Sequence, residues 1–163
     1  LKVKRMRIAV VSDTHSHNKG IIETLSSMER MDLLIHLGDF VGDGEKISKA
    51  LGLPAVIVRG NGDLSSSYKD YELIELEGKK IFLTHGHLFQ VRFNINKLYY
   101  KALELGADIA LFGHTHIPVN LAHDDLIIMN PGSPSYPRGG SLKKTFGLIE
   151  LAEDIKTEIL TVF

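Results

Sequence analysis

The chain has 163 residues, of which 44% are apolar and 24% charged, and its formal net charge is −1. This length suits a single domain spanning residues 1–163, and the balanced charge argues against a broad surface for binding nucleic acid or membrane. The sequence contains no cysteine. Disulfides, cysteine-ligated zinc and thiol nucleophiles are therefore excluded, and any metal must be bound through nitrogen and oxygen atoms.

The N-terminal segment leads directly into a strand-like apolar run and has no apolar stretch ending at a small-residue cleavage site, so we expect no signal peptide. No segment reaches the roughly 18 consecutive apolar residues that a membrane-spanning helix needs. We therefore expect a cytoplasmic protein without membrane contact.

The first half of the chain alternates strands and helices. Short β-branched runs predict three strands that are buried on both faces, at residues 8–11, 33–37 and 55–58. Apolar residues at helical spacing predict a helix over 19–30, with Asn18 available as its cap, and a shorter helix over 45–51. Strands alternating with helices indicate an α/β fold, in which sites collect at the carboxyl ends of the strands.

The second half contains hairpins. The predicted strands cover residues 71–76, 79–84, 109–112, 118–121, 126–129, 146–151 and 155–162. A helix is predicted over 95–105, ended by Gly106, and residues 130–140 form a long loop rich in proline and glycine. Exposed edge strands in this half would allow a homodimer.

Five predicted strands end in loops that carry polar side chains. These loops read Asp13-Thr-His15, Gly38-Asp39, Gly60-Asn61-Gly-Asp63, His85-Gly-His87 and Gly113-His-Thr-His116. Taken singly, Asp13, Asp39 and Asn61 could be helix caps or turn residues. If the strands are parallel neighbours, however, all of these side chains converge on one rim of the sheet.

Carboxylate, imidazole and amide ligands suit divalent ions such as manganese, nickel, iron, cobalt or zinc. Two such cations about 3.5–4 Å apart repel each other and need a bridging anion, a task that one aspartate can perform. The excess positive charge of such a pair would attract an anionic phosphate ester.

In this order the five motifs resemble those of the calcineurin-like metallophosphoesterase superfamily. The compact length and the sequence Asn130-Pro-Gly-Ser133 resemble its small prokaryotic phosphodiesterase branch. The resemblance implies an α/β fold built as a four-layer α/β/β/α sandwich, with two packed mixed β-sheets flanked by helices. It also implies a metal-dependent phosphodiesterase that acts on a small phosphate-ester substrate through a hydroxide bound to two metals.

The resemblance further implies which residues bind two divalent ions, manganese being expected first. Asp13, His15 and His116 would bind one ion, and Asn61, His85 and His114 the other, with Asp39 bridging both. Asp39, Asn61 and His85 would be the catalytic residues among these ligands.

Three further residues are candidates for supporting the ligands or contacting the substrate. Asp63 is placed to orient the Asn61 loop, His87 follows the ligand His85, and Arg138 could pair with a phosphate. His36, inside an apolar strand, is expected to be a hydrogen-bonded structural residue. Gly62 departs from the larger relatives, which commonly carry histidine there to assist the leaving group. We therefore expect a preference for esters with good leaving groups.

Two alternatives remain open. The chain could be a non-catalytic metal-binding scaffold for protein interactions, because a retromer subunit of similar size uses the same fold in that way. It could also be a nuclease of the same superfamily, although its near-neutral charge disfavours binding to nucleic acid.

Overall fold

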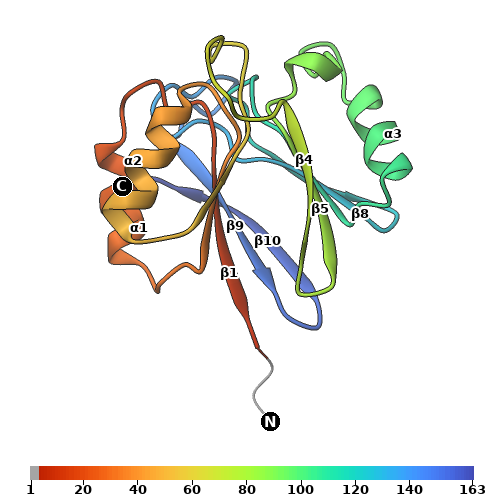
Figure 1. Ribbon diagram of the computed structural model, residues 1–163, viewed down its shortest axis with the longest axis horizontal. Coiled ribbons are helices and arrows are strands. Elements are labelled where there is room, and N and C mark those ends of the chain that lie inside the picture. The colour runs from red at the N-terminus through yellow and green to blue at the C-terminus, as the bar shows by residue number, and fades with distance from the viewer. Residues whose placement is uncertain (1–3) are drawn as a thin grey trace.

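The computed structural model describes residues 4–163. Residues 1–3, which begin the segment expected to lack a signal peptide, lie outside the described part of the chain. Two five-stranded sheets pack face to face, with helices on both outer sides (Figure 1). The predicted α/β/β/α sandwich of two mixed sheets is confirmed.

The first sheet has the strand order β10-β9-β1-β2-β3. Its strands are β1 (Met6–Val11), β2 (Leu33–His36), β3 (Ala55–Ile57), β9 (Thr145–Leu151) and β10 (Ile155–Thr161). β1, β2 and β3 run parallel, whereas β9 pairs antiparallel with both β1 and β10. The carboxyl ends of β1, β2 and β3 therefore lie at the same edge.

The second sheet has the strand order β4-β5-β6-β8-β7. Its strands are β4 (Tyr71–Leu76), β5 (Lys79–Thr84), β6 (Ile109–Leu111), β7 (Val119–His123) and β8 (Leu126–Asn130). β5, β6 and β8 are parallel, and the outer strands β4 and β7 are antiparallel to their neighbours.

The uninterrupted apolar run of β1 is explained by burial on both faces. Ile8 and Val10 point into the core between the two sheets, while Ala9 and Val11 face the helices. All four side chains are completely buried. A strand enclosed in this way has no solvent-facing side to carry polar residues.

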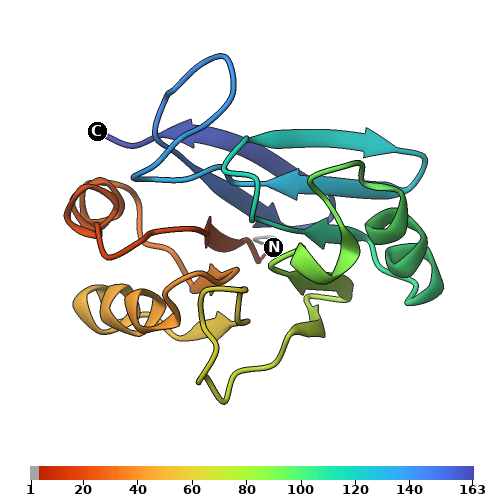
Figure 2. The same ribbon diagram turned by 90° about the horizontal axis from the view of Figure 1, so that it is seen from above.

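Three α-helices form the outer layers, and Figure 2 shows them on opposite sides of the paired sheets. α1 (Lys19–Ser27) and α2 (Val41–Leu51) cover the first sheet through Ile21, Leu25 and Ile47. α3 (Asn96–Glu104) covers the second sheet through Leu98 and Ala102. A short 3₁₀ turn, η1 (His87–Phe89), was not predicted.

Apart from two helices, the predicted boundaries differ from the observed ones by at most two residues. α1 stops at Ser27, because Met28 is already extended, so the predicted end at residue 30 is wrong. α2 begins at Val41 rather than at residue 45. The Asp63 carboxylate accepts the N–H groups of Phe40 and Val41 at 2.8 and 3.0 Å, so a residue distant in sequence starts the helix.

Asn18 occupies the N-cap position of α1, as predicted, but its side chain does not cap the helix. The Asn18 side chain makes no capping hydrogen bond and instead donates to Asp43 Oδ1 at 2.9 Å. Among the helices of residues 4–163, none is long and apolar enough to cross a membrane.

Candidate metal centre

The candidate ligands come from five strand-end loops that meet above the two sheets. β1 rises from the bottom of Figure 1, and the loops after β1, β2, β3, β5 and β6 gather at the opposite end. The prediction that these five strands are parallel neighbours in one sheet is wrong, because they are divided between the two sheets. β1, β2 and β3 belong to the first sheet, and β5 and β6 to the second.

Two overlapping groups of side chains have the spacing of metal ligands. Asp13, His15 and His116 form the first, and Asp13, Asp39 and His85 form the second; within each group the ligand atoms lie within 4.8 Å of one another. Asp13 is thus common to both groups.

The distances within the first group are short. His116 Nε2 lies 3.2 Å from Asp13 Oδ1 and 3.3 Å from His15 Nε2. Three ligand atoms therefore face the same small volume.

In the second group, His85 Nε2 lies 3.6 Å from Asp39 Oδ1 and 3.8 Å from Asp13 Oδ1. His114 Nδ1 lies 3.2 Å from the same His85 nitrogen, which makes His114 a fourth candidate ligand. Asn61 is exposed in the turn between Gly60 and Gly62, the only exposed residue of the seven predicted ligands.

One buried oxygen tests whether these residues fit a cation. Asp13 Oδ2 accepts hydrogen bonds from Ser12 Oγ at 2.6 Å and from the His114 N–H at 3.0 Å. Asp13 Oδ1, on the same fully buried side chain, has no hydrogen-bond partner as long as His116, whose Nε2 lies 3.2 Å away, is neutral; a protonated His116 would donate to it. Leaving such an acceptor unpaired costs about 1–3 kcal/mol. A cation bound at Oδ1 would supply the missing partner, so the residues fit a metal.

The orientation of two histidines agrees with this interpretation. His85 Nδ1 donates to the Leu37 carbonyl at 2.8 Å, and His116 Nδ1 donates to the Tyr136 carbonyl at 2.7 Å. In the neutral imidazole, a proton fixed on Nδ1 leaves the lone pair on Nε2. Both Nε2 atoms face the carboxylates and are available as ligands.

The ionisation of the site also favours metal binding. Burial raises the pKa of Asp13, but hydrogen bonds from His116 and Ser12 and the charge of His85 outweigh it and hold that pKa at about 2. Burial, together with the charges of His85 and Arg92, lowers the pKa of His114 to about 4. At neutral pH the carboxylate is therefore ionised and the His114 imidazole is neutral, the forms that bind metals.

His116 behaves differently. Burial lowers the pKa of its imidazole, but the hydrogen bond to Asp13 and the charge of that carboxylate outweigh burial and raise it. A proton on His116 occupies the position beside Asp13 Oδ1 that a cation would take. A cation bound here would therefore compete with a proton for the same pair of atoms.

The ligands are held in a strained backbone. Asp13, His15, Asp39, His114 and His116 all have positive φ angles, between 47° and 70°. Such conformations cost non-glycine residues on the order of 1–3 kcal/mol each and persist where the surrounding structure enforces them, often at functional sites.

Two glycines allow this close packing. A Cβ atom on Gly60 would lie 2.3 Å from Asp39 Oδ1, and one on Gly113 would lie 2.1 Å from Ser12 Oγ. Any larger residue would displace the carboxylates that the site depends on.

Asp63 stabilises the loops that carry two of the candidate ligands. In addition to starting α2, its carboxylate accepts the Gly60 N–H at 2.8 Å. Asp63 thus joins the loops that carry Asp39 and Asn61.

A second supporting carboxylate, Asp43, was missed by the sequence analysis. It is buried in the first turn of α2, where its Oδ2 accepts hydrogen bonds from Thr14 Oγ1 at 2.6 Å and from the Ser16 N–H at 2.7 Å. These bonds flank His15 on both sides and fix the loop that presents it. The available signal was an acidic residue four positions after Asp39, in a segment predicted to be a loop.

The other two predicted contact residues lie on different sides of the ligands. The ring centre of His87 is 5.5 Å from that of His85, and its buried Nδ1 has no hydrogen-bond partner. Arg138 lines a pocket together with His15 and His116.

His36 is completely buried, as expected for a structural histidine. Its Nδ1 accepts the Gly38 N–H at 3.2 Å, and its Nε2 lies 3.1 Å from Thr14 Oγ1. Because the Thr14 hydroxyl donates to Asp43, it accepts from His36 Nε2. Both ring nitrogens of the neutral imidazole are satisfied.

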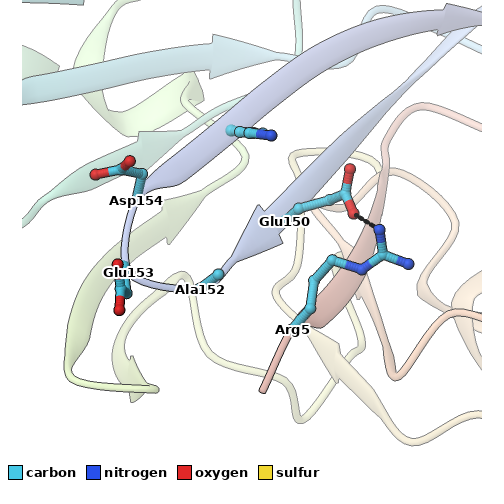
Figure 3. A pocket seen from close by; sticks show the side chains of 6 residues that line it. Arg5, Glu150, Ala152, Glu153 and Asp154 are labelled. Atoms are coloured by element: carbon cyan, nitrogen blue, oxygen red, sulfur yellow. Dashed lines mark ion pairs between the residues drawn. The ribbon is translucent and has the colours of Figure 1, made fainter. Parts of the chain in front are cut away.

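A further pocket, shown in Figure 3, lies at the other end of the first sheet. It has a volume of about 270 Å³, and its lining includes Arg5, Glu150 and the turn 152–154. Arg5 and Glu150 form an ion pair at 3.1 Å. Arg5 precedes β1 whereas the ligands follow it, so this pocket takes no part in the metal site.

The sequence profile of the calcineurin-like phosphoesterase superfamily domain matches residues 6–154, nearly the whole chain. The chain belongs to this superfamily. The chain is 34% identical over 159 residues to the probable metallophosphoesterase YsnB of Bacillus subtilis. The match covers 93% of this chain and 88% of YsnB. The phosphodiesterase MJ0936 of Methanocaldococcus jannaschii is 30% identical, covering 78% and 83%.

Solved structures agree with this membership. The crystal structure of a predicted phosphoesterase from Streptococcus pneumoniae superposes on this chain with a TM-score of 0.81 and 31% sequence identity. The superposition covers 99% of this chain and 95% of the other. Vps29 of Entamoeba histolytica, crystallised with Zn²⁺, has a TM-score of 0.77 and 21% identity, covering 96% and 99%. At that identity the second likeness concerns the fold alone.

Proposed function

We propose that the chain is a phosphodiesterase that works with two divalent cations, manganese being the first candidate and nickel, iron, cobalt and zinc the alternatives. The unpaired, fully buried Asp13 Oδ1 beside the His116 and His85 nitrogens carries the proposal. When bound, two cations lower the pKa of a water molecule and stabilise charge on the phosphoryl oxygens. The curated phosphodiesterase relative supports the same reaction class.

We assign Asp13, His15 and His116 to one cation. Asn61, His85 and His114 are assigned to the other. Asp39 is proposed as the bridge, although Asp13 is the residue common to both ligand groups. Asp39 Oδ1 also accepts the Gly62 N–H at 2.8 Å, which holds its carboxylate toward His85.

The surrounding residues orient these ligands before substrate arrives. The Leu37 and Tyr136 carbonyls keep the Nε2 lone pairs of His85 and His116 directed at the centre. Asn61 is exposed in the turn whose Gly62 N–H donates to Asp39 Oδ1, and we assign it to the solvent-facing side of the centre.

The direct test is a panel of phosphate mono- and diesters, including cyclic nucleotides, assayed with each metal. We expect diester hydrolysis that chelator abolishes and added manganese or nickel restores. Asp39→Ala should remove activity and reduce bound metal, whereas the control Asp125→Ala, an exposed turn residue, should do neither. A folded, metal-loaded protein that hydrolyses none of these esters would refute the proposal.

A non-catalytic scaffold of the same fold is the rival, favoured by Gly62, which can provide no proton to a leaving group. The rival predicts metal binding without turnover. Metal content measured together with turnover in the same sample separates the two.

A further inference from the structure

An open pocket of about 650 Å³ lies beside the histidines assigned to one cation. It is lined by His15, His116, Phe40 and residues 135–138. The Asn61 turn does not line it, so the pocket extends from the centre on the His15 side.

Two exposed aromatic rings distinguish this pocket. Phe40 is 42% exposed and Tyr136 is 46% exposed. Both rings meet His15 edge to face, with centroids at 5.0 Å and 5.6 Å from its imidazole. His15 therefore lies between two partly exposed aromatic rings, of which Tyr136 also packs edge to face on His17 with ring centroids 5.1 Å apart.

The backbone conformation of Phe40 is fixed by a hydrogen bond to a distant residue. Its φ angle is 73°, a left-handed conformation that bulky residues rarely adopt. The hydrogen bond from its N–H to Asp63 holds it there, directly after Asp39. Neither helix packing nor core burial accounts for an exposed aromatic ring held in this way.

Residues 135–138, which line the pocket opposite Phe40, are also held by hydrogen bonds. The Tyr136 N–H donates to Ser133 Oγ at 2.8 Å, and the Tyr136 carbonyl accepts from His116 Nδ1. The Arg138 N–H donates to the His116 carbonyl at 3.2 Å. The loop that presents Tyr136 and Arg138 is thus tied to a metal ligand, and the pocket is formed in advance.

We propose that this pocket binds a planar aromatic group carried by the phosphate ester. Phe40 and Tyr136 would pack against the ring, and the Arg138 guanidinium would pair with the phosphoryl oxygens. The preferred substrates are then aryl or nucleoside phosphodiesters, which present the same aromatic chemistry. The inference rests on the proposed function, because it places the phosphate at the metal ligands.

The first test measures binding without turnover. Benzylphosphonate and methylphosphonate share a non-hydrolysable phosphonate, and only the first carries a ring. By calorimetry on the metal-loaded protein, Phe40→Leu and Tyr136→Leu should each weaken benzylphosphonate binding roughly three- to tenfold and leave methylphosphonate unchanged. Arg138→Ala should weaken both ligands by the same factor.

Matched controls lie outside the pocket. Phe93, 84% exposed, is replaced by leucine, and the exposed Lys143 by alanine. Neither change should alter the binding of either phosphonate. Equal affinities for both phosphonates in the parent protein, unaffected by Phe40→Leu and Tyr136→Leu, would overturn the inference.

The second test holds the leaving group constant. p-Nitrophenyl esters that retain a methyl, a phenyl or a thymidine 5′ group are compared by kcat/KM. Faster turnover of the phenyl and thymidine esters, lost in Phe40→Leu, supports the pocket; a thymidine ester well above the phenyl ester identifies a nucleoside substrate. Equal turnover of all three esters that is also unchanged in Phe40→Leu contradicts the inference and leaves the proposed function intact, because the p-nitrophenyl ring shared by the esters could otherwise fill the pocket. If no ester is hydrolysed, the proposed function fails, and phosphonate binding still decides the pocket.

Discussion

The buried His36 makes the stability of the chain depend on pH in a calculable way. Burial lowers the pKa of its imidazole from 6.5 to about 4. In the unfolded chain the imidazole takes up its proton near pH 6.5, so acid favours unfolding. The free energy of unfolding should therefore fall as the pH drops from 6.5 to 4. With about 1.4 kcal/mol per pKa unit, the loss attributable to His36 is about 3 kcal/mol.

Urea unfolding at several pH values between 4 and 7, in the presence of chelator, measures this loss. His36→Gln keeps a donor toward Thr14 but removes the titrating group. Between pH 6.5 and pH 4, the free energy of unfolding of His36→Gln should fall by ~3 kcal/mol less than that of the parent protein, whatever the absolute stability of the variant. The exposed His123, replaced by glutamine, is the control and should retain the parental slope. Parallel pH profiles for the parent and His36→Gln would refute the reasoning.

Two further predictions concern residues around the ligands. Asp43→Asn should reduce affinity for the cation at His15 about 10–100-fold, as measured by competition with a metal indicator, because the Thr14 and Ser16 hydrogen bonds weaken; unchanged affinity would count against this support. A Cβ on residue 62 would lie 3.0 Å from Asp39 Oδ1, so Gly62→Ala measures crowding alone. Relative to Gly62→Ala, Gly62→His should raise the alkyl-to-aryl ratio of chemical-step rates about tenfold or more by supplying a proton donor. An unchanged ratio would show that leaving-group protonation does not limit the reaction.

Much of the fold was predictable because its central strands carry local signals. The run at Ile8–Val11 is apolar throughout, since it is enclosed between a helix layer and a second sheet. Each such strand ends where a polar residue begins, which located the ligand loops. The pairing of β1 with β9, more than 130 residues later, left no comparable local signal.

Two of the differences, at the start of α2 and at the Asn18 cap, share one physical cause, which is stabilisation by residues distant in sequence. α2 begins at Val41, in a segment containing Gly42 and Gly44, because Asp63 accepts its first N–H groups. Asn18 precedes α1 as a cap would, but the buried Asp43 takes its side chain. Helix propensity and capping preference are local, and these tertiary hydrogen bonds override them.

The number of metal ions bound per chain tests the central claim most directly. Elemental analysis of the purified, metal-loaded protein should find two divalent ions per chain, and fewer than one in Asp39→Ala if this carboxylate bridges the pair. Asp125→Ala should retain both ions. One ion or none in the parent protein, or two ions retained in Asp39→Ala, would contradict the account of a bridged metal pair.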